Sequence, residues 1–197
     1  MEVRMDGDMT TPGLIRNVAL YIDTPNIQIR GDGELRRYLD HDQVDWAELV
    51  SLMVGSLDVE RCTLVGGLYM FRNNTTLMRR HMHDIKIALG RYREAIDVVG
   101  TLKDVDSRII IDMWGDVIGL LRRWNQEHPD VLCEVTVLLA SGDHIYADAV
   151  RKMREALDGL VRIRLHTFAW EGKIAPGLDE TSEEVTLLDD LSPFVRL

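Results

Sequence analysis

The amino-acid sequence predicts an α/β fold in which helices cover both faces of a mainly parallel sheet. Short apolar runs that are typical of buried strands alternate along the chain with longer segments of helical apolar spacing. This alternation predicts βαβ units, because parallel strands need a crossover between them. The chain has 197 residues, 46% of them hydrophobic and 28% charged, which fits one globular domain. We therefore expect a polar N-terminal extension over residues 1–13 and a single domain over residues 14–197, with an acidic segment from about residue 169.

Several segments have the composition of strands. The first, residues 17–23, is a β-branched and aromatic run bounded by Gly13 and Pro25, and it is predicted to be buried. The clearest is the run Val-Thr-Val-Leu-Leu-Ala at residues 135–140. Three more strands are expected at residues 62–71, 95–99 and 161–168.

Helices are expected between these strands. Residues 45–54 carry apolar side chains at i, i+3, i+4 and i+7 and begin with Asp45, a residue type that favours N-caps. The longest helix is predicted over residues 107–126, where apolar side chains recur at i, i+4, i+7, i+11 and i+14. Two more helices are expected at residues 75–92 and 145–157, a polar loop at 171–184, and a last short helix and strand at 185–197.

Charge and cysteine usage exclude several classes of protein. Acidic residues number 33 against 23 basic ones, and the net charge of -10 excludes a general electrostatic DNA clamp. Cys62 and Cys133 fit no zinc spacing and are expected to be reduced, buried thiols. The sequence contains no run of 18 apolar residues, and its first 13 residues are polar and acidic. We therefore expect no membrane span, no secretory signal and a cytoplasmic protein.

Carboxylate side chains are predicted to gather at one edge of the sheet. Asp23 ends the first strand, Asp143 follows the clearest strand, and Asp106 stands where the longest helix begins. Ligands of parallel sheets bind beyond the carboxyl ends of the strands, which makes these side chains candidates for a site. Converging carboxylates repel one another unless a cation neutralises them, and hard oxygen donors suit Mg²⁺ or Mn²⁺. Such an ion activates a bound water and stabilises the charge that develops on a phosphodiester during hydrolysis.

Each of these carboxylates also has an ordinary structural explanation. Ser141 and Asp143 are typical of a cap for the helix that follows them, and Asp23 before Thr-Pro is typical of a turn. Asp104 or Asp106 could cap the longest helix in the same way.

Asp112 lies farther along that helix. It falls in an apolar run, where an unpaired carboxylate would be costly to bury, although position 112 could instead face solvent. Six residues on an ideal helix place Asp106 and Asp112 about 120° apart. The two can therefore share one metal only if Asp106 precedes the helix or the ligands are spread out.

Three short motifs resemble those of the NYN family (LabA-like), a branch of the PIN-like or FEN-like metal-dependent nucleases. Ile22-Asp23-Thr24-Pro25-Asn26 is similar to the IDxxN motif that ends the first strand of that family. Lys103-Asp104-Val105-Asp106 followed by Asp112 resembles its KGVD motif and the aspartate some six residues on. Ser141-Gly142-Asp143-His144-Ile145-Tyr146 resembles its SGDxDF motif. The resemblance covers residues 18–197, and the order and spacing of the motifs carry it.

The resemblance implies a three-layer α/β/α sandwich around a mainly parallel sheet, and metal-dependent hydrolysis of RNA with Mg²⁺ or Mn²⁺. It also implies an acidic metal site formed by Asp23, Asp106, Asp112 and Asp143, supporting polar groups at Asn26 and Ser141, and a phosphate contact from Lys103. Two positions depart from the family pattern: Ile145 stands in place of a second aspartate, and Asp104 replaces a glycine. The alternative is therefore a catalytically impaired relative that binds RNA or protein.

A basic segment offers a place for nucleic acid. Residues 72–93 carry six basic residues, Arg79 and Arg80 among them, and one acidic residue. Such a segment could hold the phosphate backbone of single-stranded or structured RNA, although it is equally typical of a solvated helix face. Segments 1–13 and 169–197 together carry ten acidic and three basic residues, so only -3 of the net charge of -10 belongs to the remaining chain. The sequence leaves the oligomeric state open, a homo-oligomer included.

Overall fold

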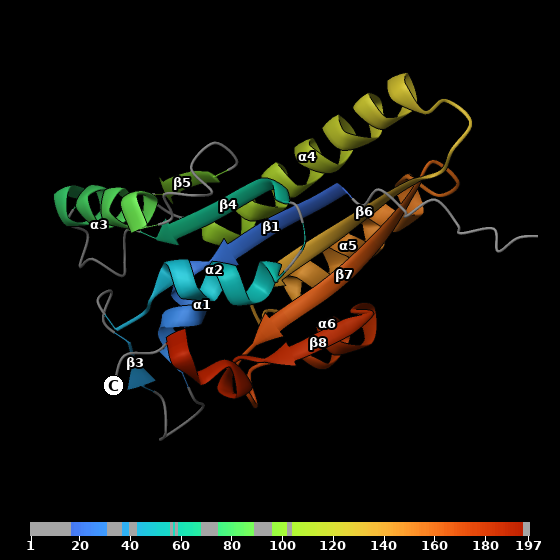
Figure 1. Cartoon of the computed structure of the whole chain (residues 1–197). Helices are drawn as coiled ribbons and strands as arrows, with labels where there is room; N and C mark the ends of the chain where they lie inside the picture. Colours follow the sequence, from blue (N-terminus) through green and yellow to red (C-terminus); the bar gives the residue numbers. More distant parts are fainter. Residues whose placement is uncertain are drawn as a thin grey trace, which may run out of the picture.

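A parallel sheet forms the centre of the protein in the computed structural model (Figure 1). The structure describes residues 17–30, 37–39, 43–55, 57, 59–67, 75–88, 96–101 and 104–194. Within this part of the chain the main sheet has six strands in the order β5-β4-β1-β6-β7-β8, and every neighbouring pair is parallel. The strands are β1 (Asn17–Asp23), β4 (Val59–Gly67), β5 (Ile96–Thr101), β6 (Cys133–Ala140), β7 (Val161–Ala169) and β8 (Glu184–Leu187). The predicted extension over residues 1–13 and Lys103 lie outside the described residues.

Helices cover both faces of the sheet, which confirms the predicted three-layer α/β/α architecture. The helices are α1 (Thr24–Gln28), α2 (Trp46–Val54), α3 (Thr75–Ala88), α4 (Val105–Glu127), α5 (Ile145–Ala156) and α6 (Pro176–Thr181). Residues of α2 and α3 form one core cluster with the sheet, and residues of α4, α5 and α6 form a second. Alternate residues of β1 divide between the two, because successive side chains of a strand point to opposite faces. All seven residues of β1 are buried.

The order of the strands creates one natural binding position. From β1 the chain proceeds outward to β4 and β5, and from β6 it proceeds outward in the opposite direction to β7 and β8. The direction in which successive strands are added to the sheet therefore reverses between β1 and β6. These two strands pair from Asn17 with Val135 to Ile22 with Ala140. In open parallel sheets, ligands bind in the crevice beyond the carboxyl ends of the strands at such a reversal. Asp23 ends β1, and Ser141 directly follows β6.

The predicted strands and helices are present, with shifted ends. Asp45 caps α2 as predicted, since its side chain accepts a hydrogen bond from the backbone N–H of Glu48 at 3.1 Å. The strand expected at residues 62–71 begins earlier, at Val59, because β1 offers pairing partners from Val18 onward. Its expected end at residues 68–71 lies outside the described residues. Cys133 is a buried free thiol, as the sequence predicts.

The C-terminal region differs from the prediction. The expected loop over residues 171–184 contains α6, which has Pro176 in its first turn and buries Leu178 and Thr181. A helix of less than two turns is too short to show a readable apolar period, so the sequence did not indicate it. The last two elements come in the reverse of the expected order, because the strand β8 precedes a 3₁₀ helix, η4 (Leu188–Phe194).

The sequence also gave no indication of the segment that follows β1. The short helix α1 begins directly after Asp23, and a small antiparallel pair follows it, made of β2 (Ile29–Arg30) and β3 (Arg37–Tyr38). The indole N–H of Trp170, at the end of β7, donates to the carbonyl of Ile27 at 2.9 Å and holds α1 against the sheet. Among the described residues no helix has both the length and the apolar character needed to cross a membrane.

Candidate active site

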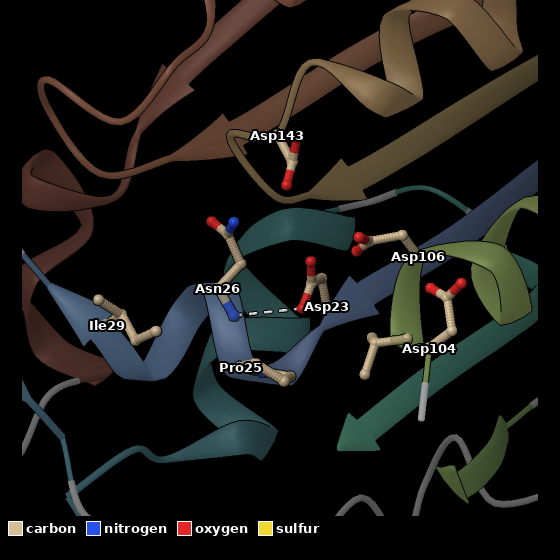
Figure 2. A pocket seen from close by; sticks show the side chains of 8 residues that line it. Asp23, Pro25, Asn26, Ile29, Asp104, Asp106 and Asp143 are labelled. Atoms are coloured by element: carbon tan, nitrogen blue, oxygen red, sulfur yellow. Dashed lines mark hydrogen bonds between the residues drawn. The ribbon is translucent and has the colours of Figure 1, made fainter. Parts of the chain in front are cut away.

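A polar pocket of about 270 Å³ lies at the carboxyl edge of the sheet, where the strand order reverses (Figure 2). Four carboxylates line it: Asp23 at the end of β1, Asp104 and Asp106 at the start of α4, and Asp143 after β6. The amide of Asn26 in α1 lines it as well. Figure 2 shows the side chains of Asp23, Asp106 and Asp143 directed toward one shared space. The structure therefore brings together three of the four carboxylates that the sequence predicts for the site.

Asp23 is the most buried of these carboxylates, with only 4% of its surface exposed. Its Oδ1 accepts a hydrogen bond from the backbone N–H of Asn26 at 3.2 Å, which caps α1. Its Oδ2 accepts from the hydroxyl of Ser141 at 3.2 Å. The pKa of Asp23 is raised from its ordinary 3.8 to about 7, mainly by burial and to a smaller extent by the negative charge of Asp106, while the hydrogen bonds to the carboxylate oppose the shift. Asp23 therefore caps the turn that follows β1 and also lines the pocket.

Asp106 lies in the first turn of α4, where its carboxylate reaches the same space. Its pKa is also raised, first by burial and then by the negative charges of Asp143 and Asp104, while a hydrogen bond from Tyr146 opposes the shift. The hydroxyl of Tyr146 is 3.0 Å from Oδ1 of Asp106 and 3.3 Å from Oδ2 of Asp23. Burial and the two carboxylates raise the pKa of Tyr146 far above its ordinary range, so this phenol stays protonated and acts as a donor.

Asp104 divides its role between helix and pocket. It caps α4, since its side chain accepts from the backbone N–H of Ser107 at 3.1 Å and from the Ser107 hydroxyl at 2.6 Å. These hydrogen bonds lower the pKa of Asp104 below its ordinary value. The sequence predicts Asp104 only as a possible helix cap and as a departure from the NYN motif, whereas in the structure it also lines the pocket. Its position two residues before Asp106, at the start of the helix, could have indicated this.

The loop after β6 is held by backbone and side-chain hydrogen bonds. The amide N–H of Gly142 donates to the side-chain oxygen of Asn26 at 3.1 Å, which ties this loop to α1. The Ser141 hydroxyl accepts from the backbone N–H of Asp143 at 3.3 Å and donates to Asp23. A Cβ atom at Gly142 would overlap the backbone carbonyl of Lys173, so this close approach requires glycine.

Asp143 remains partly open to solvent, with 38% of its side chain exposed. Its Oδ1 accepts from the backbone N–H of Ile145 at 3.4 Å and lies 3.0 Å from Nδ1 of His144. The cap expected at this position is thus weak, and the carboxylate keeps a face toward the pocket. Ile145 is partly buried against the core cluster of α4 and α5, so no ligand stands at the position where the NYN motif has its second aspartate.

Asp112 does not line the pocket, contrary to the implied metal site. Asp112 follows Asp106 by six residues, which corresponds on an ideal helix to a rise of about 9 Å along the axis and a rotation of about 120° around it. Its Oδ2 instead accepts from Nε of Arg108 at 2.7 Å, one helical turn away. A single straight helix cannot aim both carboxylates at one point, and Asp106 has the position nearer the sheet edge.

The predicted substrate-binding residues divide into two groups. Asn26 and Ser141 lie at the pocket, as described above. Arg79 and Arg80 are exposed on α3, outside the pocket lining, and Nε of Arg80 lies 4.0 Å from Asp84. The structure does not describe Lys103. The sequence did not indicate that Tyr146 contacts Asp23 and Asp106, because an aromatic residue on an apolar helix face is usually a core residue.

The donor chemistry of the pocket suits a hard divalent cation. In the part of the chain that the structure describes, no three or more His, Cys, Asp or Glu side chains lie close enough together to hold a metal ion. Mg²⁺, however, usually binds through one or two carboxylates and keeps several waters, so it does not require a closed cage. The buried Asp23 beside Asp106 supplies such a pair, and their raised pKa values reflect first burial and then neighbouring negative charge, which a cation would neutralise.

Comparison with known proteins supports the fold alone. A crystal structure of a protein of unknown function from Vibrio parahaemolyticus aligns over 98% of this chain and 100% of its own, with a TM-score of 0.57 and 14% sequence identity. At this identity the likeness concerns architecture. No protein-family model and no curated protein matches the sequence.

Proposed function

We propose that this protein is a metal-dependent ribonuclease, a member of the NYN group of PIN-like nucleases. The observation that carries the proposal is the buried carboxylate of Asp23 beside Asp106, in a pocket that Asp143 also lines. A carboxylate with a strongly raised pKa in a cleft is a candidate functional residue, because burying it costs stability. Three chain segments that are distant in sequence supply these acids. They meet at the point where the strand order reverses, between β1 and β6, which is where α/β proteins bind their ligands.

In this proposal Asp23 and Asp106 hold a Mg²⁺ or Mn²⁺ ion, with Asp143 as a further oxygen donor. When bound, the ion lowers the pKa of a coordinated water and stabilises charge on the phosphodiester. Ser141 orients Asp23 through its hydroxyl, and Asn26 fixes the loop that carries Asp143 by accepting the Gly142 N–H. Asp143, with 38% of its side chain exposed, is more accessible to water than Asp23, which is 4% exposed.

The proposed substrate is single-stranded or structured RNA, and the proposed location is the cytoplasm. Arg79 and Arg80 are exposed on α3, the helix that packs against the edge strand β5. Exposed arginines of this kind contact phosphates without reading sequence.

The test compares two aspartate variants on labelled RNA with Mn²⁺. Asp23→Asn keeps the shape of the side chain and removes its charge, and we expect cleavage to fall at least a hundredfold, since each tenfold step costs only 1.36 kcal/mol in the barrier. Asp112→Asn is the matched control, because Asp112 lies outside the pocket and pairs with Arg108. Asp112→Asn should cleave RNA within threefold of the rate of the parent protein. EDTA should abolish cleavage by the parent and by Asp112→Asn. Equal cleavage by the parent and Asp23→Asn contradicts the proposed active site.

A second function is favoured by the apolar residue at position 145. Ile145 packs toward the core and contributes no oxygen to the pocket, so a catalytically impaired module that binds RNA or protein is the alternative. Fluorescence anisotropy on the same labelled RNA separates the two. Binding that persists without any Mn²⁺-dependent cleavage in the parent protein favours the binding module over the nuclease.

A further inference from the structure

Tyr146 is a buried tyrosine whose hydroxyl contacts two carboxylates of the pocket at once. It belongs to the first turn of α5 and has no exposed surface. Its hydroxyl oxygen lies 3.0 Å from Oδ1 of Asp106 and 3.3 Å from Oδ2 of Asp23. Asp23 comes from the end of β1 and Asp106 from the start of α4. The hydroxyl of Tyr146 in α5 therefore links these two elements.

The position of this hydroxyl is fixed by packing. Tyr146 lies in the core cluster that α4 and α5 form with the sheet, together with the fully buried Ile109 and Met113 of α4. Core side chains are packed as densely as organic crystals, so a phenol ring in this position has little freedom to tilt. The Asp106 carboxylate is only partly buried and can turn about its own bonds more easily. The tyrosine is therefore held more rigidly than Asp106.

We propose that Tyr146 is a positioning residue that sets the separation and orientation of the Asp23 and Asp106 carboxylates. This proposal rests on the proposed function, in which those two carboxylates hold a divalent cation. A phenol has one proton and two lone pairs, so it donates to one carboxylate at a time and stays close to the other. Without the hydroxyl, Asp23 keeps its hydrogen bonds from the Asn26 N–H and the Ser141 hydroxyl, but Asp106 loses its hydrogen bond from a side chain fixed in the core. The Asp106 carboxylate is then expected to turn away from Asp23.

Loss of the hydroxyl should weaken cation binding. Hydrogen-bond partners of metal-ligating side chains typically contribute tenfold to a hundredfold in metal affinity. Tyr146→Phe removes a single oxygen atom and leaves the ring in the core, so the fold is expected to persist. Tyr21→Phe is the matched control: Tyr21 is equally buried in the same cluster, and its hydroxyl donates to Asp116 at 2.9 Å, outside the pocket lining.

The experiment measures the Mn²⁺ dissociation constant of the full-length parent, Tyr146→Phe and Tyr21→Phe by electron paramagnetic resonance, with urea unfolding of each protein alongside. We expect Tyr146→Phe to bind Mn²⁺ ten to a hundred times more weakly than the parent, and Tyr21→Phe to bind it within twofold. A purely structural role would lower the stability of both variants and leave both dissociation constants unchanged. That result overturns the proposal.

Crystal structures of the metal-free parent and Tyr146→Phe supply a second readout that does not depend on metal. A wider separation of the Asp23 and Asp106 carboxylates in the variant supports the positioning role, and an unchanged separation overturns it. A parent protein that binds no Mn²⁺ counts against the proposed function alone, and the two crystal structures then decide the role of Tyr146.

Discussion

Asp23 should make the folded protein less stable as the pH rises from 4 to 8. Burial raises the pKa of this carboxyl to about 7 in the folded protein, against an ordinary 3.8 that applies to the unfolded chain. Between these two values the folded state holds a proton that the unfolded state has lost, so each step up in pH favours unfolding. At 1.36 kcal/mol for each pKa unit, the full difference amounts to about 4 kcal/mol. That is a large part of the 5 to 15 kcal/mol that stabilises a typical domain.

The perturbation that isolates this contribution is Asp23→Asn, measured by urea unfolding in EDTA from pH 4 to pH 8. Asparagine can still accept the hydrogen bond from the Asn26 N–H, but it has no proton to lose in this range. The stability of the variant relative to the parent should therefore rise by about 4 kcal/mol across the window. Asp112→Asn serves as the control, since it removes only an ion pair with Arg108 one turn away, worth about 0.3 to 0.5 kcal/mol.

Two results would refute this reasoning. If the stability difference between the parent and Asp23→Asn changes by less than about 1 kcal/mol from pH 4 to pH 8, burial does not perturb Asp23 as the structure implies. Mn²⁺ at a hundred times the dissociation constant of the parent should stabilise the parent at pH 8 by about 2.7 kcal/mol and Asp23→Asn by much less. If Mn²⁺ stabilises the two proteins equally, the ionised pocket is not the cation site.

Two further predictions concern the loop after β6 and the basic face of α3. Gly142→Ala should destabilise the protein by about 1 to 3 kcal/mol in urea unfolding, because the new methyl group overlaps a backbone carbonyl; a change below about 0.5 kcal/mol would show that the loop can yield. Replacing Arg79 and Arg80 by alanine should weaken RNA binding and reduce the slope of log affinity against log salt by about 1 to 2. The same change at Arg122 and Arg123, exposed near the far end of α4, should leave the slope unaltered, and equal effects of the two pairs would remove α3 from the interface.

The sequence located the edge of the sheet that carries the pocket because that inference needs only local patterns. Apolar runs fix where β1 and β6 end, and parallel strands bring those ends to one edge, so Asp23 and Asp143 could be predicted to approach each other. Asp106 followed from the start of the longest helix in the same way. The fold class rests on equally local evidence, since alternating strand and helix patterns leave few arrangements other than a covered parallel sheet.

The remaining members of the pocket depend on angles between elements, which spacing does not encode. Asp112 was expected in the site from a resemblance in sequence order, but it lies about 120° around α4 from Asp106 and pairs with Arg108 of the same helix. Tyr146 could not be predicted as a contact of Asp23 and Asp106, because the destination of its hydroxyl depends on how α5 packs beside α4 and β1. Asp104 was one of two candidates for the cap of α4, and only the direction in which the chain enters α4 brings its carboxylate into the lining.

The hydrogen bonds around Asp23 indicate what kind of ligand this pocket takes. The Asn26 N–H, the Ser141 hydroxyl and the Tyr146 hydroxyl all approach its two oxygens, an arrangement that suits an acceptor with no proton of its own. Among the described residues that line the pocket there are four acids and no lysine, arginine or histidine, so no lining side chain supplies a balancing positive charge. An ionised Asp23 is thus hydrogen-bonded but not neutralised, and at neutral pH it destabilises the fold. The ligand that would remove this cost is positively charged, and it must fit among oxygen donors, which is the requirement that a divalent cation meets.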